Sequence, residues 1–218
     1  MTRLVLIRHG EAQSYVDGVI GGPTGCTGLS DLGRRQARAL HDRLARTGEL
    51  ADVSTVYTST LPRAIETADL VVPALGEHRR ADPSCELCEL HVDEELDARP
   101  FQDFEETYEW PPTSNPYEPW APGAEPWAEF VLRVGRALDR ITREHRDETI
   151  AVVCHGGVIG AALTVFAELP LRQPFRLHID NTSLTEWRLQ PDVRGVDRWT
   201  LTRFNDAGHL EGMEPVRG

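Results

Sequence analysis

Three segments of the chain place basic side chains just after a short apolar run. Residues 4–7 precede Arg8 and His9, residues 53–57 precede a polar stretch that ends at Arg63, and residues 149–154 precede His155. Such runs are typical of strands buried on both faces of a parallel sheet. Parallel strands end along one edge of their sheet, where ligands bind, so we expect these four side chains to converge. Together with helix N-termini they would bind a dianion such as a phosphoryl group.

Each of the four residues has a simpler explanation when taken alone. A single arginine after a strand is most readily explained as a surface residue, and a single histidine as a buried structural one. The combination of two arginines and two histidines at three strand ends is what indicates a site.

The pattern between these segments predicts α/β architecture. Ser30 is suited to cap a helix that runs to about residue 46 and ends at Gly48, and Pro62 is suited to the first turn of the next helix. Further helices are expected over 125–146 and 158–166, and a hairpin over 184–189 and 199–204. Alternating strands and helices predict a three-layer sandwich, a mostly parallel sheet with helices on both faces. We expect residues 1–218 to form a single domain.

Residues 91–126 interrupt this alternation. Pro100 marks the start of a short helix that would carry Phe101, Phe104 and Tyr108 on one side, and six prolines fall between residues 111 and 126. The segment is too small to bury a core of its own. We therefore expect a proline-rich helical insertion that caps the site, not a separate domain.

Composition excludes several classes of protein. The formal net charge is −12, which argues against nucleic-acid partners. The chain contains no lysine, so it has no P-loop of the GxxxxGK[ST] form. Its apolar stretches are too short for a signal peptide or a membrane span, which favours a cytoplasmic protein with no membrane partner.

The order of motifs resembles the histidine phosphatase superfamily, also called phosphoglycerate mutase-like, and in particular its first branch. The matching segments are LVLIRHGE (4–11), LSDLGRRQA (29–37), YTSTLPRAIETA (57–68), LCE (87–89), PGAEPWAEFVLRV (122–134) and VVCHGGVI (152–159). The RHGE tetrapeptide alone is weakly specific. Its occurrence with TSxLxRAxxTA and a late CHGG at strand ends, in family order, is strongly specific.

The resemblance implies a role for each of the four basic residues. His9 would be the nucleophile that becomes phosphorylated on a ring nitrogen, and Arg8, Arg63 and His155 would bind the phosphoryl oxygens. Phosphoryl transfer needs chiefly positioning and fixed positive charge. An imidazole attacks only when neutral, so one ring nitrogen of His9 must donate a hydrogen bond while the other faces phosphorus. His155 is expected to be cationic when phosphate is bound.

The family's general acid is a glutamate after the second helix, which the resemblance matches to Glu89. Glu86 lies three residues earlier and remains the alternative. Phosphoglycerate mutases have an asparagine where this chain has Tyr15. The glycine-rich stretch 18–28 is a candidate phosphate cradle. Asn181 resembles a recurrent family asparagine, although a role in a turn explains it equally well.

Cys85 and Cys88 form one CxxC pair. A zinc site or a redox pair is conceivable, but no second CxxC or HxxxH lies at ligand spacing, which favours a structural role. We expect no catalytic metal and no cofactor.

These observations predict a metal-independent phosphomonoesterase that acts through a phosphohistidine on a small phosphorylated metabolite. One alternative is a mutase that moves a phosphoryl group within a phosphoglycerate. Acidic residues and prolines after Glu89 replace the arginine- and tyrosine-containing stretch of cofactor-dependent mutases, which favours hydrolysis. The other alternative is a non-catalytic member that binds phosphoproteins, against which the intact nucleophile argues. The sequence does not identify the substrate, and a homodimer remains open.

Overall fold

The protein is built on one six-stranded sheet. The computed structural model describes residues 1–105, 115–172 and 175–213. The strands are β1 (Thr2–Arg8), β2 (Val53–Thr58), β3 (Arg79–Arg80), β4 (Thr149–Cys154), β5 (Leu184–Pro191) and β6 (Asp197–Asp206). They follow the order β3-β2-β4-β1-β5-β6, with the first four parallel and the last two antiparallel. The predicted α/β class and late hairpin are confirmed, and the sheet is mixed because that hairpin adds to one edge.

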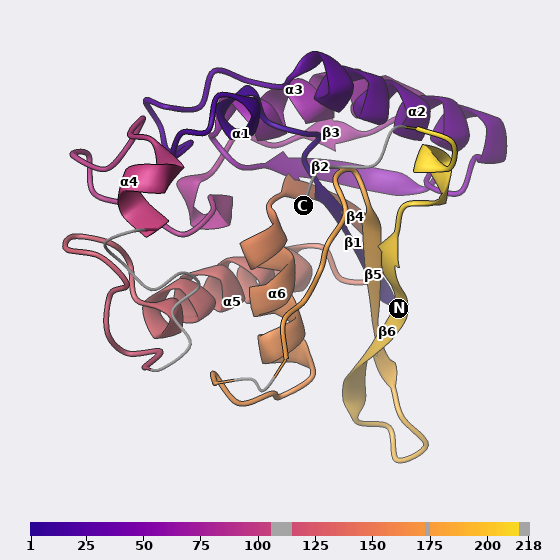
Figure 1. Cartoon of the computed structure of the whole chain (residues 1–218). Helices are drawn as coiled ribbons and strands as arrows, with labels where there is room; N and C mark the ends of the chain where they lie inside the picture. Colours follow the sequence, from indigo (N-terminus) through magenta and orange to yellow (C-terminus); the bar gives the residue numbers. More distant parts are fainter. Residues whose placement is uncertain (106–114, 173–174, 214–218) are drawn as a thin grey trace.

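The helices form a layer on each side of the sheet (Figure 1). Those of the described residues are α1 (Gln13–Val16), α2 (Asp31–Thr47), α3 (Pro62–Val71), α4 (Phe101–Glu105), α5 (Trp127–Glu144) and α6 (Gly156–Phe166), with 3-10 turns at Val72–Ala74, Cys85–Leu87 and Gly208–Leu210. As predicted, the Ser30 hydroxyl caps α2 by accepting from the Gly33 N–H, and Gly48 ends it in a left-handed conformation.

Central strands alternate between the two cores. In β1, Leu4 and Leu6 face the core under α5 and α6, whereas Val5 and Ile7 face the core under α2 and α3. Successive side chains of a strand point to opposite faces. The uninterrupted apolar runs found in the sequence are therefore what a sheet covered on both sides requires.

The predicted insertion is described in part. A short helix does begin beside Pro100, and its Phe101 is one third exposed. The positions of Phe104 and Tyr108 that we expected on one helix side lie outside the residues whose side chains are described. Half-buried Trp120 and buried Ala121 and Ala124 pack in a small apolar cluster with Ile20, so this part of the insertion is attached to the loop that follows β1, as expected of a segment that is not a separate core.

Among the described residues, no helix combines the length and the apolar character that a bilayer crossing requires.

Candidate active site

The ends of three neighbouring parallel strands lie at one edge of the sheet. Arg8, the last residue of β1, pairs with Cys154, the last residue of β4, and Thr58 of β2 pairs with Val153. The chain leaves β1 towards the helices on one face and leaves β4 towards α6 on the other (Figure 1). Such a switch point opens a crevice at the carboxyl ends of the strands.

His9 is held as a neutral imidazole with one nitrogen directed to the site. Its Nδ1 lies 2.6 Å from the carbonyl oxygen of Gly10, which can only accept, so Nδ1 carries the proton. Its Nε2 accepts a hydrogen bond from Nε of Arg63 at 3.1 Å. Burial, together with the charges of Arg63 and Arg8, holds the pKa of His9 well below its ordinary value. This is the tautomer that the sequence argument required of a nucleophile.

The backbone around His9 is fixed by close packing. The His9 carbonyl accepts hydrogen bonds from the Asn181 side chain at 3.0 Å and the Thr182 N–H at 3.3 Å. A Cβ on Gly10 would lie 2.5 Å from the carbonyl oxygen of Gly33, so only glycine fits after the histidine. Asn181 therefore positions the backbone of His9 and also lines the cavity beside it.

The other three basic residues surround His9. Nη1 of Arg63 donates to the Gly21 carbonyl at 2.6 Å, and Arg8 donates to the Ile179 carbonyl. The His155 ring lies 5.0 Å from the His9 ring, centroid to centroid, in an edge-to-face arrangement. The structure thus brings together the four side chains selected from the sequence.

Two buried nitrogens at this site have no hydrogen-bond partner among the described residues. They are Nε of Arg8 and Nδ1 of His155. Burial, reinforced by Arg63, His9 and Arg8, also lowers the pKa of His155 well below its ordinary value, so this side chain is neutral when the site holds no anion. A bound dianion would supply acceptors and oppose the effect of the arginines. The expected cationic form of His155 therefore stays a prediction for the phosphate-bound enzyme.

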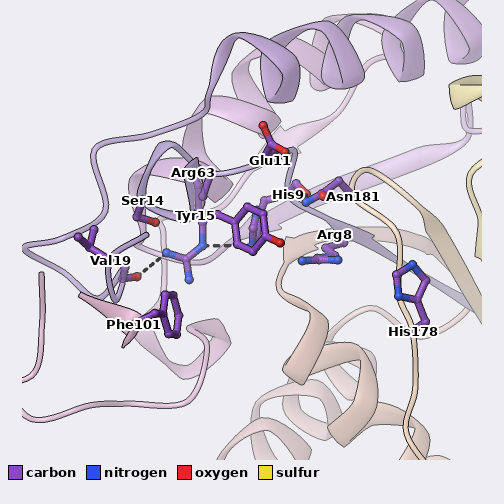
Figure 2. Close-up of a pocket in the computed structure, with 12 residues that line it drawn as sticks. Arg8, His9, Glu11, Ser14, Tyr15, Val19, Arg63, Phe101, His178 and Asn181 are labelled. Atoms are coloured by element: carbon purple, nitrogen blue, oxygen red, sulfur yellow. Dashed lines mark hydrogen bonds between the residues drawn. The ribbon is translucent and has the colours of Figure 1, made fainter. Parts of the chain in front are cut away.

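A cavity of about 380 Å³ opens in front of His9 (Figure 2). Arg8, His9 and Arg63 contribute to its wall. The remaining labelled residues in Figure 2 include four that the sequence argument did not assign to the site: Ser14, Tyr15, Phe101 and His178. These four residues come from three segments that are far apart in the sequence. Their spacing therefore gives no sign that they line one cavity.

Glu89 is not among the described residues that line the cavity. Its Oε2 accepts from the Gly157 N–H at 2.9 Å and its Oε1 from the Leu90 N–H at 3.1 Å. A Cβ on Gly157 would lie 2.0 Å from Oε1, so glycine makes room for the carboxylate. The charge of Glu89 also acts on Arg8, where it opposes the lowering of the pKa by burial. These contacts place Glu89 at the start of α6 and close enough to Arg8 for its charge to act on that guanidinium.

Glu86 faces away from this arrangement. Its carboxylate is partly exposed and pairs with Arg140 of α5 at 2.6 and 3.0 Å. The hydrogen bond and the charge of Arg140 hold the pKa of Glu86 below its ordinary value. The ion pair gives Glu86 a surface role.

The glycine-rich stretch differs from the expected phosphate cradle. The backbone N–H groups of Gly22, Thr24 and Gly25 donate to the carboxylate of Asp97, at 2.8, 2.6 and 3.0 Å. An internal carboxylate therefore occupies the anion-binding loop that the sequence suggested. The prediction that this stretch cradles a phosphate is therefore wrong for these three N–H groups, because the anion that they bind is Asp97.

The cysteine pair has a third neighbour that the sequence search missed. His91 lies with Cys85 and Cys88, and the three ligand atoms are all within 4.8 Å of one another. Burial raises the pKa of the Cys88 thiol, but hydrogen bonds from His91, Ser59 and Thr60 outweigh burial and lower the pKa to about 6. The sequence patterns considered for zinc, a second CxxC or an HxxxH, do not include one histidine placed three residues after a CxxC pair.

Comparison with known proteins identifies the family. The model of the histidine phosphatase superfamily (branch 1) matches residues 4–206, and the chain belongs to this superfamily. The chain is 31% identical over 220 residues to phosphoglycerate mutase-like protein 4 of Arabidopsis thaliana, covering 95% of this chain and 86% of that protein. It is 28% identical over 224 residues to a putative phosphoserine phosphatase 2 of Hydrogenobacter thermophilus, covering 98% and 100%.

Solved structures share the fold. The phosphoserine phosphatase of Entamoeba histolytica in complex with 3-phosphoglyceric acid superposes with a TM-score of 0.72 at 22% identity, over 96% of this chain and 100% of that one. At this identity the likeness concerns the fold alone. The predicted enzyme class, a phosphatase of the histidine phosphatase family, is confirmed by the family match and by the phosphatase among the relatives.

Proposed function

We propose that the chain is a phosphomonoesterase that transfers the phosphoryl group of a small metabolite to His9 and then to water, without a catalytic metal. The observation that carries this proposal is the tautomer of His9. Nδ1 donates to the Gly10 carbonyl, which leaves the lone pair of Nε2 directed to Arg63 at the cavity. A neutral, oriented imidazole beside two arginines is what nucleophilic attack on a phosphate monoester needs.

In the first step, Nε of Arg63 would transfer its hydrogen bond from Nε2 of His9 to a phosphoryl oxygen, and the freed Nε2 lone pair would attack phosphorus while the bond from phosphorus to the ester oxygen breaks. Arg8, Arg63 and His155 would stabilise the charge on the three equatorial oxygens, which is the role that a metal plays in other phosphoryl-transfer sites. Glu89, in its protonated form, would give its proton to the leaving alkoxide. The products of this step are an alcohol, a phosphohistidine and the Glu89 carboxylate.

In the second step, water would attack the phosphohistidine. Glu89 would take one proton from that water as the bond between phosphorus and nitrogen breaks. Inorganic phosphate leaves, and both His9 and Glu89 return to their starting forms. The Gly157 N–H bonded to Glu89 supports this exchange of roles because it keeps the carboxyl group at one place.

The cavity supports a small substrate. A volume of about 380 Å³ is at the low end of what small-molecule pockets have. Phe101, from the insertion, lines it, which supports the proposal that residues 91–126 cap the site and select the substrate. Phosphoserine and phosphoglycerates are the first compounds to test, because proteins of similar sequence or fold carry those names or ligands.

The test follows the phosphoryl group. A ³²P-labelled substrate should leave acid-labile, alkali-stable label on the rapidly quenched wild-type protein, and His9→Ala should abolish both label and turnover. Turnover in His9→Ala with the same label on another residue would overturn the assignment.

Two further measurements separate the alternatives. Hydrolysis of p-nitrophenyl phosphate should persist in excess chelator and be inhibited by vanadate. Loss of that activity on chelation, with recovery on adding Mg²⁺, would contradict a metal-independent reaction. A mutase would instead interconvert 3- and 2-phosphoglycerate faster than it releases phosphate, and a non-catalytic member would do neither.

A further inference from the structure

A cluster of three potential metal ligands lies outside the phosphate-binding groups. Cys85, Cys88 and His91 all belong to one seven-residue segment with the pattern CxxCxxH. Sγ of Cys85 lies 3.3 Å from Nε2 of His91, and all three ligand atoms lie within 4.8 Å of one another. Zn–S bonds of about 2.3 Å and Zn–N bonds of about 2.0 Å set ligand atoms roughly 3.5–3.8 Å apart in a tetrahedral site. The cluster therefore needs only shifts of about 1 Å or less, with Cys85 and His91 moving slightly apart and the wider pairs moving closer.

The backbone holds the segment in this form. A 3-10 turn at Cys85–Leu87 places the Cys88 N–H on the Cys85 carbonyl at 3.0 Å, which brings the two thiols to one side. Arg133 of α5 donates to the carbonyls of Cys85, Glu86 and Cys88 at 3.0, 3.0 and 3.2 Å. The ligand positions are thus fixed by hydrogen bonds that do not involve a metal.

The surroundings also suit metal ligands. The hydroxyls of Ser59 and Thr60 lie 3.3 and 3.0 Å from Sγ of Cys88, where they can hydrogen-bond a thiolate. Nδ1 of His91, the ring nitrogen that is not directed to the thiols, lies 3.9 Å from the carboxylate of Glu125. The same carboxylate accepts a hydrogen bond from the backbone N–H of His91 at 3.2 Å. At 3.9 Å this carboxylate is too far for a hydrogen bond to Nδ1, and it pairs with Arg133 at 2.6 Å. A small rotation of the ring would be needed before Glu125 could orient His91 as carboxylates orient metal-binding histidines.

We propose that Cys85, Cys88 and His91 bind one Zn²⁺ ion, with the fourth position taken by solvent. Two thiolates and an imidazole are soft and borderline ligands that favour zinc over Mg²⁺ or Ca²⁺. Cys85 and His91 are exposed whereas Cys88 is buried, so the ion would sit at the surface with one position open to water. A Cys₂His set with one open position is a known arrangement for zinc.

The ion would act on the segment that carries Glu89. Its ligands lie on both sides of that residue in the chain, so binding would fasten the backbone from Cys85 to His91 without touching the phosphoryl group. Only this consequence depends on the proposed function. Zinc binding itself is measured without substrate, so the two proposals fail separately.

The experiment uses the full chain, purified without a histidine tag and fully reduced. After dialysis with Zn²⁺ and removal of excess, elemental analysis should find one zinc per chain. One equivalent of Co²⁺ should produce the near-ultraviolet band of thiolate-to-cobalt charge transfer. Loss of a residue that only hydrogen-bonds a metal ligand weakens metal binding by about 10–100-fold. Cys85→Ser and His91→Gln each remove a ligand, so they should weaken zinc binding more.

Matched controls come from the same chain. Cys154→Ala removes a buried thiol at the end of β4 and His78→Gln a half-buried imidazole, and neither residue belongs to the cluster. Both should keep one zinc per chain. Cys85 and His91 are exposed, so their variants should fold, which circular dichroism checks.

Three results would overturn the proposal. One is the absence of a thiolate band with Co²⁺ in the reduced wild type. Another is equal zinc content in the ligand variants and the controls, which would show adventitious binding. The third is a protein whose reduced form takes up no zinc and in which Cys85 and Cys88 form a disulfide, seen as a 2 Da loss in the peptide that contains them. The pair would then be redox-active.

Discussion

Glutamine in place of Glu89 tests the proposed proton donor with little change in shape. The carboxylate now accepts the N–H groups of Gly157 and Leu90, one on each oxygen. Glutamine keeps one oxygen acceptor and turns an NH₂ group towards the other N–H. The structural cost is one hydrogen bond, about 1 kcal/mol. That cost should affect every substrate alike.

The chemical cost depends on the leaving group. An alkoxide leaves poorly without a proton, whereas p-nitrophenolate leaves without help. General acid catalysis contributes about 10²–10⁴ in rate, which corresponds to about 3–5 kcal/mol of transition-state stabilisation. Glu89→Gln should therefore slow alkyl phosphate hydrolysis by that factor and p-nitrophenyl phosphate hydrolysis much less.

The assay compares kcat/KM for both substrates in Glu89→Gln and in a matched control, Glu86→Gln. Glu86 lies three residues before Glu89 but pairs with Arg140 at the surface. Its variant should therefore hydrolyse both substrates as fast as the wild type. Competitive inhibition by inorganic phosphate reports whether the binding site is intact in each variant.

If Glu86→Gln shows the leaving-group dependence and Glu89→Gln does not, the assignment of Glu89 as the general acid is wrong, because Glu86 would then be the acid. Equal losses on both substrates in Glu89→Gln would show that Glu89 only positions other groups. If neither variant loses activity, the proton comes from another residue.

Three further predictions concern other parts of the site. Folding lowers the pKa of His9, so the unfolded chain binds a proton near pH 6.5 that the folded chain does not bind. The free energy of unfolding, measured by denaturant titration, should therefore decrease as the pH falls below 6.5. His9→Gln should reduce the slope of this free energy against pH by up to about 1.4 kcal/mol per pH unit. Gly157→Ala should displace the Glu89 carboxylate and reproduce the leaving-group dependence in kcat/KM. Gly160→Ala on the same helix should not, because its added Cβ would lie 3.8 Å from the nearest atom, an ordinary van der Waals contact. Asp97→Asn should destabilise the protein by about 1–3 kcal/mol in thermal unfolding and raise KM, because the amide keeps an oxygen for Gly22 and Gly25 but turns an NH₂ group towards the Thr24 N–H and removes the negative charge from the loop. Unchanged values would show that the loop keeps its conformation without this charge.

The sequence alone determined the layered α/β fold and the central residues of the site. Short apolar runs identified the strands because a sheet covered on both faces needs no polar alternation. Arg8, His9 and His155 could be found because each lies at the carboxyl end of a strand or directly after it, where the geometry of a parallel sheet decides the edge on which it lies. Arg63 follows a strand by only a few residues and begins the next helix.

Tertiary structure alone decided which side chains complete the cavity. Ser14, Phe101 and His178 come from three segments whose approach depends on loop packing, and no local pattern encodes it. It also decided that Asp97 fills the glycine-rich loop, a contact across more than 70 residues of chain. The same holds for the choice between Glu86 and Glu89: both are glutamates in one short segment, and only the neighbours, Arg140 for one and Gly157 for the other, give them different surroundings. Sequence patterns report local geometry, whereas the environment of a side chain depends on distant residues that only folding brings near.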